Sequence, residues 1–328
     1  MKMTPMRHFQ TAASVLTHRL PHSAKPPARI SPQRGIKMTD LIISALTDAG
    51  VDTLKLIPFL FVTYLVMEAL ERKTEGHSAN LIAEAGKWGP IAGALVGIVP
   101  QCGFSAAASS LYAGGLISIG TLLAVFLSTS DEMLPIFISE QVAVPTMVKI
   151  LAAKAVIGAL TGLGIDFILR FTRYKDKTGK RIHDLCEHEH CGCEEEEGGI
   201  VRSALVHTLH IVIFVFLISF ALTLLVEGLG EKTIAGILTG RPVIGTLLAG
   251  LIGLIPNCAA SVMITELYLE GMLGAGQMMA GLLVGAGVGL LVLFRTNARP
   301  KENLKITAIL YAAGIFWGIL IELAGIRF

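Results

Sequence analysis

Residues 97–115 read GIVPQCGFSAAASSLYAGG, and residues 253–271 read GLIPNCAASVMITELYLEG. Both stretches place a proline and an amide side chain directly before a cysteine in an otherwise apolar segment. A shift of 156 residues aligns residues 97–124 with residues 253–280, and nine of the 28 aligned positions are identical. Shared apolar composition does not align Pro, Cys, Ser and Tyr, so the pattern predicts an internal duplication.

The composition is that of a membrane protein. The chain has 328 residues, of which 53% are hydrophobic and 16% are charged, with a mean hydropathy of +0.66. Soluble proteins carry about a quarter charged residues, and several apolar segments approach the roughly 20 residues that cross a bilayer. We therefore expect an all-α polytopic membrane protein built from two homologous halves. Its expected partner is the lipid bilayer, and not nucleic acid.

Charge and hydrophobicity divide the chain into four regions. Residues 1–38 form a basic tail that is predicted to be disordered, with seven Lys or Arg residues and no acidic residue. Residues 39–171 are the first transmembrane repeat, and residues 201–328 are the second. A hydrophilic loop at residues 172–200 separates the two repeats.

Pro100 and Pro256 are expected to interrupt their helices, because proline lacks a backbone N–H and clashes with the preceding turn. In hydrocarbon, broken backbone is tolerated only inside protein or beside water. Interrupted segments at matching positions of two halves therefore point to the binding site of a transporter, with the two prolines as hinges. The other interpretation is a pair of kinked structural helices.

Each break is followed by polar residues spaced by three, four and three positions, which places them on one helix face. Together with the amide at each break, the predicted substrate path consists of Gln101, Cys102, Ser105, Ser109, Tyr112, Asn257, Cys258, Ser261, Thr265 and Tyr268. Close packing of small residues between membrane helices would explain the serines. It explains the aligned cysteines and tyrosines less well.

The charges of the loops predict how the halves are inserted. Residues 172–182 and 295–305 are both rich in Lys and Arg and are expected on the cytoplasmic side. Because both loops lie on the same side, the chain between them must cross the membrane an even number of times. This is met if residues 241–271 form a re-entrant hairpin that enters and leaves on one side. Each arm of about 15 residues is roughly 20 Å long, too short to cross the bilayer core. The same count gives three crossings and one hairpin in the first half, so the halves are expected to be inverted repeats. This arrangement places the basic tail outside the cell, against the expectation that basic segments lie in the cytoplasm. Either the native chain starts at Met38, which we favour, or the two halves are parallel.

Asp131 and Glu132 end an apolar run in the sequence STSDEMLP, and Lys149 and Lys154 follow in the next helix. Ionisable residues inside a membrane are costly and mark functional positions. Both acidic residues are therefore assigned to the substrate path, with Asp131 as the group that binds a cation or a proton. The alternative is an ion pair with one of the lysines, or a location at the membrane interface.

The hydrophilic loop contains the sequence HDLCEHEHCGCEEEE at residues 183–197. Its candidate metal ligands are His183, Cys186, His188, His190, Cys191 and Cys193. Thiolate and imidazole groups together suit Zn²⁺, Cu⁺ and similar metals, and the carboxylates add capacity for harder ions. The spacing matches no zinc-finger pattern, so we expect a loose sensor or ion-collecting loop. The other interpretation is a solvated charged loop. We expect that the protein requires no cofactor.

Three segments resemble a bacterial family of ten-transmembrane heavy-metal exporters: VPQCGFSAAASSLYAGG, LAVFLSTSDEMLPIF and IPNCAASVMITELYLEG. The resemblance covers residues 39–327 and leaves out the basic tail. Members of this family are described as arsenic efflux permeases or manganese transporters. The resemblance therefore implies a multi-pass protein of the bacterial inner membrane that exports a metal or metalloid. Ten segments equal six crossings plus four hairpin arms.

We expect a secondary transporter and not an enzyme. The sequence has no GxxxxGK[ST] motif, so an ion gradient or the gradient of the substrate would supply the energy. Trivalent arsenic prefers thiols such as Cys102 and Cys258, whereas manganese prefers the oxygens of Asp131, Gln101 and Asn257, and both substrates stay open. There are two alternatives. One is an intramembrane enzyme acting on a lipid-linked substrate, but the apolar segments contain no HExxH or GxSxG motif. The other is a metal-sensing membrane scaffold.

Overall fold

The computed structural model describes residues 38–73, 88–130, 133–171, 200–229 and 242–328, and each regular element in these ranges is an α-helix. Leu41–Phe328 form one compact unit. Five helical spans in the described ranges are long and apolar enough to cross a membrane: Ile119–Ser139, Val144–Leu169, Ala204–Leu224, Ala275–Thr296 and Pro300–Leu323. The first span includes residues 131–132, which lie outside the described ranges. The chain is a multi-pass helical membrane protein.

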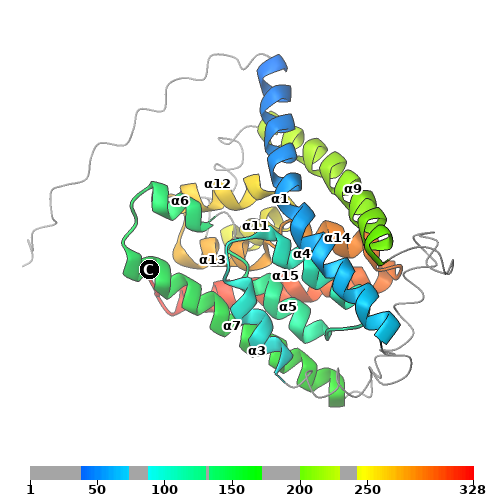
Figure 1. The fold of residues 1–328 in the computed structure, drawn as a ribbon. Helices are drawn as coiled ribbons and strands as arrows, with labels where there is room; N and C mark the ends of the chain where they lie inside the picture. Colours follow the sequence, from blue (N-terminus) through cyan, green and yellow to red (C-terminus); the bar gives the residue numbers. More distant parts are fainter. Residues whose placement is uncertain (1–37, 74–87, 131–132, 172–199, 230–241) are drawn as a thin grey trace, which may run out of the picture. The chain divides into compact units, whose positions relative to one another are not determined.

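The two halves contain helices in the same order (Figure 1). The first half contains α1 (Met38–Lys73), α3 (Gly89–Gly97), α4 (Cys102–Ala113), α5 (Ile119–Ser128), α6 (Met133–Ser139) and α7 (Val144–Phe171). The second half contains α9 (Ile200–Leu229), α11 (Pro242–Gly253), α12 (Cys258–Leu269), α13 (Ala275–Val284), α14 (Val288–Thr296) and α15 (Pro300–Leu323). Helices α4 and α12 begin and end 156 residues apart, and so do α5 and α13.

The structure divides two of these spans, Ile119–Ser139 and Ala275–Thr296, into two helices each. Helix α5 ends at Ser128 and α13 ends at Val284, and a short connection leads from each to the next helix. In the second connection Gly287 has a φ of 53°, which glycine adopts without a steric penalty. In the first, the hydroxyl of Thr129 bonds to a carbonyl of the preceding turn and competes with helix continuation. Neither break contains a proline, so the signal used for the other two breaks does not find them.

Carboxylates hold the starts of the two broken helices. Asp166 of α7 accepts hydrogen bonds from Ser118 Oγ at 2.6 Å and from the backbone N–H of Gly120 at 2.9 Å. At the matching position of the second half, Glu322 of α15 accepts from the backbone N–H of Gly276 at 3.0 Å. The first N–H groups of a helix lack intrahelical partners, and a negative charge there is favourable. These two carboxylates therefore stabilise the starts of α5 and α13.

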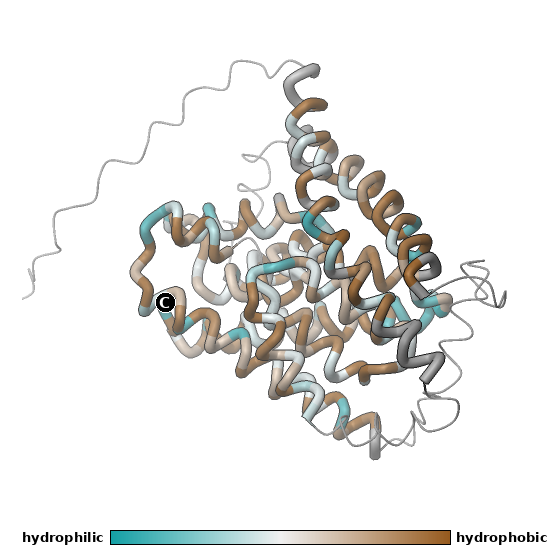
Figure 2. The backbone as a smooth tube through the Cα atoms, in the orientation of Figure 1, coloured by the Kyte–Doolittle hydropathy of each residue, from teal (hydrophilic) through white to brown (hydrophobic). Residues whose placement is uncertain are grey.

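The long outer helices present apolar side chains at their surfaces. Few residues of the spans in α7 and α9 are fully buried, whereas the spans formed by α5 with α6 and by α13 with α14 are buried over most of their length. On α9, large exposed side chains recur every four residues: Leu205, Leu209, Ile213 and Leu217. Most of the helical backbone in Figure 2 has the colours of hydrophobic residues. Such a continuous apolar stripe is expected where a helix faces lipid.

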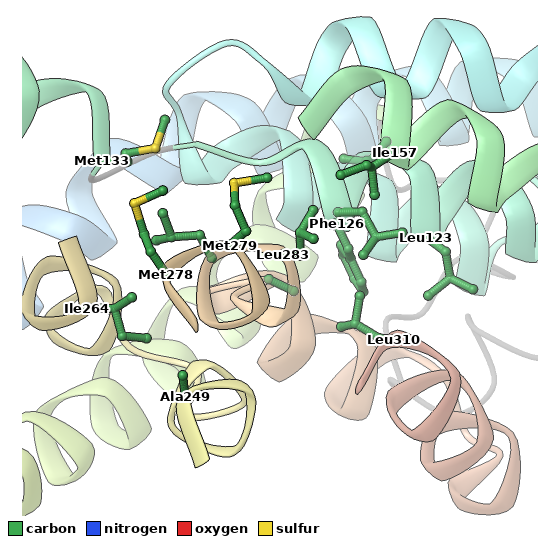
Figure 3. Close-up of a cluster of buried hydrophobic side chains, with 14 of the residues drawn as sticks. Leu123, Phe126, Met133, Ile157, Ala249, Ile264, Met278, Met279, Leu283 and Leu310 are labelled. Atoms are coloured by element: carbon green, nitrogen blue, oxygen red, sulfur yellow. The ribbon is translucent and has the colours of Figure 1, made fainter. Parts of the chain in front are cut away.

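The core lies where the broken helices of the two halves meet. Phe126 of α5, Leu283 of α13 and Leu310 of α15 belong to one cluster of buried side chains (Figure 3). The backbones approach closely at glycines, since a Cβ atom at Gly253 would lie 2.2 Å from the carbonyl oxygen of Gly281. Small residues permit such contacts between membrane helices. Protein therefore surrounds the broken helices, as interrupted backbone in a membrane requires.

Candidate functional site at the helix breaks

The break after α5 is a buried polar segment. Ser128, Thr129 and Ser130 are all buried. Ser128 Oγ donates to the carbonyl oxygen of Ala124 at 2.8 Å, and Thr129 Oγ1 donates to that of Val125 at 2.7 Å. The carbonyls at the end of α5 thus give partners to the buried hydroxyl groups.

A lysine connects the broken helices of the two halves. Lys154 of α7 is buried, and its ammonium group donates to the backbone carbonyl of Thr129 and, at 3.0 Å, to that of Leu282. Thr129 directly follows α5, and Leu282 lies in the last turn of α13. Both carbonyls are therefore at C-terminal helix ends, where the helix dipole places negative partial charge. The two helix ends contribute to compensating a charge that is costly to bury.

Helix α4 places its polar face against α14 of the other half. Cys102 is the buried first residue of α4, and Ser105 Oγ donates to its carbonyl oxygen at 2.9 Å. Ser109 Oγ donates to the carbonyl oxygen of Gly289 in α14 at 2.7 Å. A Cβ atom at Gly289 would lie 2.8 Å from Ser105 Cβ, so the two helices touch here. The predicted stripe on α4 is thus buried at an interface between the halves.

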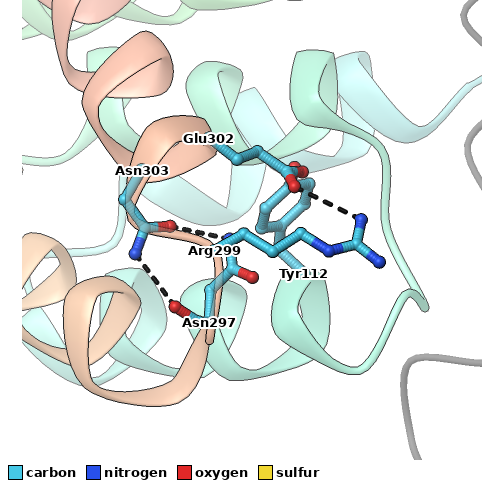
Figure 4. A network of polar contacts seen from close by, with 5 residues as sticks. All are labelled: Tyr112, Asn297, Arg299, Glu302 and Asn303. Atoms are coloured by element: carbon cyan, nitrogen blue, oxygen red, sulfur yellow. Dashed lines mark hydrogen bonds and ion pairs between the residues drawn. The ribbon is translucent and has the colours of Figure 1, made fainter. Parts of the chain in front are cut away.

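Tyr112, the last residue of that stripe, belongs to a polar network with the start of α15 (Figure 4). Its hydroxyl donates to the buried carboxylate of Glu302, and Arg299 Nη1 lies 3.5 Å from the other carboxylate oxygen. Asn297 Nδ2 donates to Asn303 Oδ1 at 2.6 Å, and Asn303 Nδ2 donates back to the carbonyl of Asn297 at 3.0 Å. The network attaches the end of α4 to the turn between α14 and α15.

Helix α12 is the counterpart of α4 and contacts α6 and α13. Thr265 is buried and donates to the carbonyl oxygen of Ser261 at 2.7 Å, while Ser261 and Tyr268 are half-buried. A Cβ atom at Gly285 would lie 3.2 Å from Ser261 Oγ. Ser261 therefore lies beside the break after α13, and the stripe on α12 is more open than the stripe on α4.

The two predicted amides lie between the short helices and bond to the long first helix of their own half. Gln101 Nε2 donates to the carbonyl oxygen of Lys55 in α1 at 3.5 Å. Asn257 is buried, and its Nδ2 donates to Thr223 Oγ1 in α9 at 2.8 Å. The amide nitrogens hold both side chains against these long helices.

The two prolines and the two membrane cysteines differ in their surroundings. Pro100 is exposed and Pro256 is half-buried, each in the connection between two short helices. Cys102 lies in an apolar cluster with residues of α1, α9 and α14, and this cluster does not include Cys258, which is half-buried. Both are free thiols. Within the described ranges, no group of three or more His, Cys, Asp or Glu side chains is placed to hold a metal ion.

Several predicted residues lie outside the described residues and stay predictions. They are Asp131, Glu132 and the loop residues His183, Cys186, His188, His190, Cys191 and Cys193.

The structure adds two residues that the sequence analysis did not select, Lys154 and Glu302. Lys154 was considered only as an ion-pair partner, although a lysine inside an apolar helix is itself a signal. Glu302 stands in the first turn of α15, where acidic residues commonly interact with the helix dipole at a surface. Its burial depends on Tyr112, which is distant in sequence.

Comparison with known proteins finds one family. The model of the family described as "Putative, 10TM heavy-metal exporter" matches residues 37–233. This range contains α1, α3 to α7 and α9, together with the break after α5 and Lys154. No curated protein and no solved structure matches the chain.

Proposed function

The chain belongs to the family of 10TM heavy-metal exporters, and on this premise we propose that it is a secondary transporter that exports a heavy-metal ion or metalloid, manganese or arsenic, by alternating access. The observation that carries the proposal is the pair of buried helix breaks after α5 and α13, joined by Lys154. Interrupted membrane helices offer backbone carbonyls and helix ends to a solute near the middle of the bilayer.

We propose that the halves are inverted repeats. The matched bounds of α4 with α12 and of α5 with α13 support this arrangement. A hydrogen bond of 3.0 Å from Trp317 Nε1 to Thr161 Oγ1 also supports it. These two residues are 156 positions apart and therefore equivalent in the two halves, and equivalent positions that touch lie next to the axis that relates two repeats. Helices α3 and α4 are roughly 14 Å and 18 Å long at 1.5 Å per residue, too short for a core of roughly 30 Å. They form a re-entrant hairpin. With α1 as a crossing beside the two spans counted above, the first half crosses three times, and this odd number reverses the insertion of the second half.

The substrate path lies where each polar stripe faces a helix of the other half. The stripe on α4 contacts α14, and α12 contacts α6. A movement of one half relative to the other separates these faces and exposes the hydroxyls and the thiols. Pro100 and Pro256 are the hinges at which the hairpins bend, because proline prevents a continuous helix there.

The substrate decides which groups bind it. Arsenic(III) would use the thiols of Cys102 and Cys258, whereas manganese would use oxygen atoms of Asp131, Gln101 and Asn257. The loop at residues 183–197 would collect metal ions on the cytoplasmic side of the bacterial inner membrane. Transport needs no cofactor and uses an ion gradient or the gradient of the substrate.

Uptake by everted membrane vesicles tests the proposal. Mn²⁺, Zn²⁺, Fe²⁺ and arsenite are supplied separately to vesicles that contain the protein. We expect one of them to accumulate, and we expect Asp131→Asn to abolish the accumulation, while the matched control Glu140→Gln, at an exposed position, leaves it unchanged. Cys102→Ser and Cys258→Ser should abolish arsenite uptake only. If correctly inserted protein accumulates none of the four, the exporter proposal is wrong.

A further inference from the structure

Lys154 brings together two backbone carbonyls from different halves of the chain. They belong to Thr129 and Leu282, they come from the C-terminal ends of α5 and α13, and they converge on Lys154 Nζ. Carbonyl oxygens at the ends of interrupted helices coordinate cations in transporters. Manganese and other hard or borderline cations take oxygen ligands of this kind. The ammonium group of Lys154 therefore stands where a metal cation would be bound.

Lys154 is not needed to make a helix break. The second half has a break after α13, and there the position equivalent to Lys154, at the offset of 156 residues, is Leu310, which is buried in the apolar cluster. A cationic side chain that is present beside the break of one half and absent from the other marks a function and not a common support.

We propose that the carbonyl oxygens of Thr129 and Leu282 form a binding site for the transported metal cation, and that the ammonium group of Lys154 occupies this site when no metal is bound. The inference rests on the proposed function, and it narrows the substrate to a cation and excludes neutral arsenous acid. An incoming metal cation displaces the ammonium group because like charges a few ångströms apart repel each other. When the metal leaves, the lysine returns, so the buried carbonyls always have a partner.

The same exchange links metal binding to movement of the two halves. When no metal is bound, Lys154 joins the end of α5 to the end of α13, which lie in different halves. Displacement of the Lys154 side chain removes this connection. The metal ion then takes the place of the ammonium group, so a compact charge replaces a hydrogen-bond donor on a long flexible side chain. The two halves are therefore joined at this point by the lysine without metal and by the metal ion when it is bound.

Metal binding to the full-length protein in detergent tests the proposal. Mn²⁺ and Zn²⁺ are titrated by calorimetry into the natural protein, Lys154→Met, Lys154→Arg and Lys149→Met, the last an exposed position on the same helix. We expect Lys154→Met to bind at least about tenfold more tightly than the natural protein, because the competing charge is gone. Lys154→Arg keeps a cation in the site and should bind no more tightly, and Lys149→Met should bind like the natural protein. A merely structural role predicts no gain in metal affinity for Lys154→Met.

Each outcome decides the proposal. Equal affinities of the natural protein and Lys154→Met for both metals overturn it. If Lys154→Met and Lys154→Gln yield folded protein only when Mn²⁺ is present during purification, the metal replaces the ammonium group and the proposal is supported. If neither variant folds even with Mn²⁺, Lys154 is a structural connection and the proposal is overturned.

The vesicle assay separates this inference from the proposed function. Export of arsenite by the natural protein, without metal binding to Lys154→Met, keeps the exporter and removes the cation site. Tight Mn²⁺ binding by Lys154→Met, without export of any ion by the natural protein, keeps the cation site and removes the exporter.

Discussion

Replacing Asp166 by alanine should destabilise the protein more than removal of any exposed carboxylate. Asp166 is 9% exposed and accepts hydrogen bonds from Ser118 Oγ at 2.6 Å and from the N–H of Gly120 at 2.9 Å. In Asp166→Ala, the buried N–H of Gly120 loses its acceptor, and the hydroxyl of Ser118 loses its shortest hydrogen bond. Both groups belong to the start of α5, so the loss acts on one of the two central broken helices.

The magnitude follows from these two bonds. A hydrogen bond to a charged group contributes about 1.5–3 kcal/mol, and a buried donor without a partner costs about 1–3 kcal/mol. Removing a buried carboxylate also removes its desolvation cost, which offsets part of the loss. We therefore expect Asp166→Ala to lower the free energy of unfolding by about 2–3 kcal/mol. Asp166→Asn keeps an acceptor for the N–H of Gly120 and should cost about 1 kcal/mol.

The matching carboxylate of the second half provides a comparison. Glu322 is half-buried and accepts one backbone bond, from Gly276 at 3.0 Å, so Glu322→Ala should cost about 1 kcal/mol, as for loss of a helix cap. The two carboxylates share no hydrogen-bond partner among those described, so the double variant should lose the sum of the single losses.

Unfolding by SDS in mixed detergent micelles, followed by tryptophan fluorescence, measures these free energies. Trp317 reports on the contact between α15 and α7. Glu140→Ala, at an exposed position after α6, is the control and should change the free energy by less than about 0.5 kcal/mol. If Asp166→Ala costs no more than Glu140→Ala, the assignment of Asp166 as the stabilising group of α5 is refuted.

The same unfolding assay checks two further predictions. Gly253→Ala should cost roughly 2 kcal/mol or more, because its Cβ atom would lie 2.2 Å from a backbone carbonyl oxygen of α13. Gly164→Ala, with no atom within 4 Å of the added Cβ, should instead gain about 0.5–1 kcal/mol of helix propensity, and equal effects of the two changes would contradict the close packing of α11 on α13. Tyr112→Phe should cost about 1–2 kcal/mol, because the buried carboxylate of Glu302 loses a donor. Tyr311→Phe removes an exposed bond to a backbone carbonyl and should cost less, and the reverse order would argue against the network in Figure 4.

Local chemistry was sufficient to predict the two breaks that contain proline. Helix α3 ends at Gly97 and α4 begins at Cys102, on either side of Pro100, and α11 and α12 are separated in the same way around Pro256. Proline acts through its own ring and its missing N–H, which are properties of one residue. The prediction of a multi-pass membrane protein likewise required only the length and composition of the apolar segments.

The breaks after α5 and α13 could not be predicted in this way. Ser128, Thr129 and the glycines of residues 285–287 are all found inside membrane helices, so the residue types do not identify a break. What makes these breaks stable is that protein surrounds them and that hydroxyls and Lys154 bind the carbonyls. The hydroxyls are local, but Lys154 and the surrounding protein come from other helices, and a local sequence pattern does not contain them.

The sequence by itself determined that the polar residues after each proline share one helix face, because helical geometry depends only on spacing along the chain. It did not determine what that face contacts. Only the tertiary structure placed Ser109 against Gly289 and Tyr112 against Glu302, and buried Lys154 between the ends of α5 and α13. These contacts join segments more than a hundred residues apart, and their formation depends on how the apolar surfaces of the two halves pack together and not on the residues near each group.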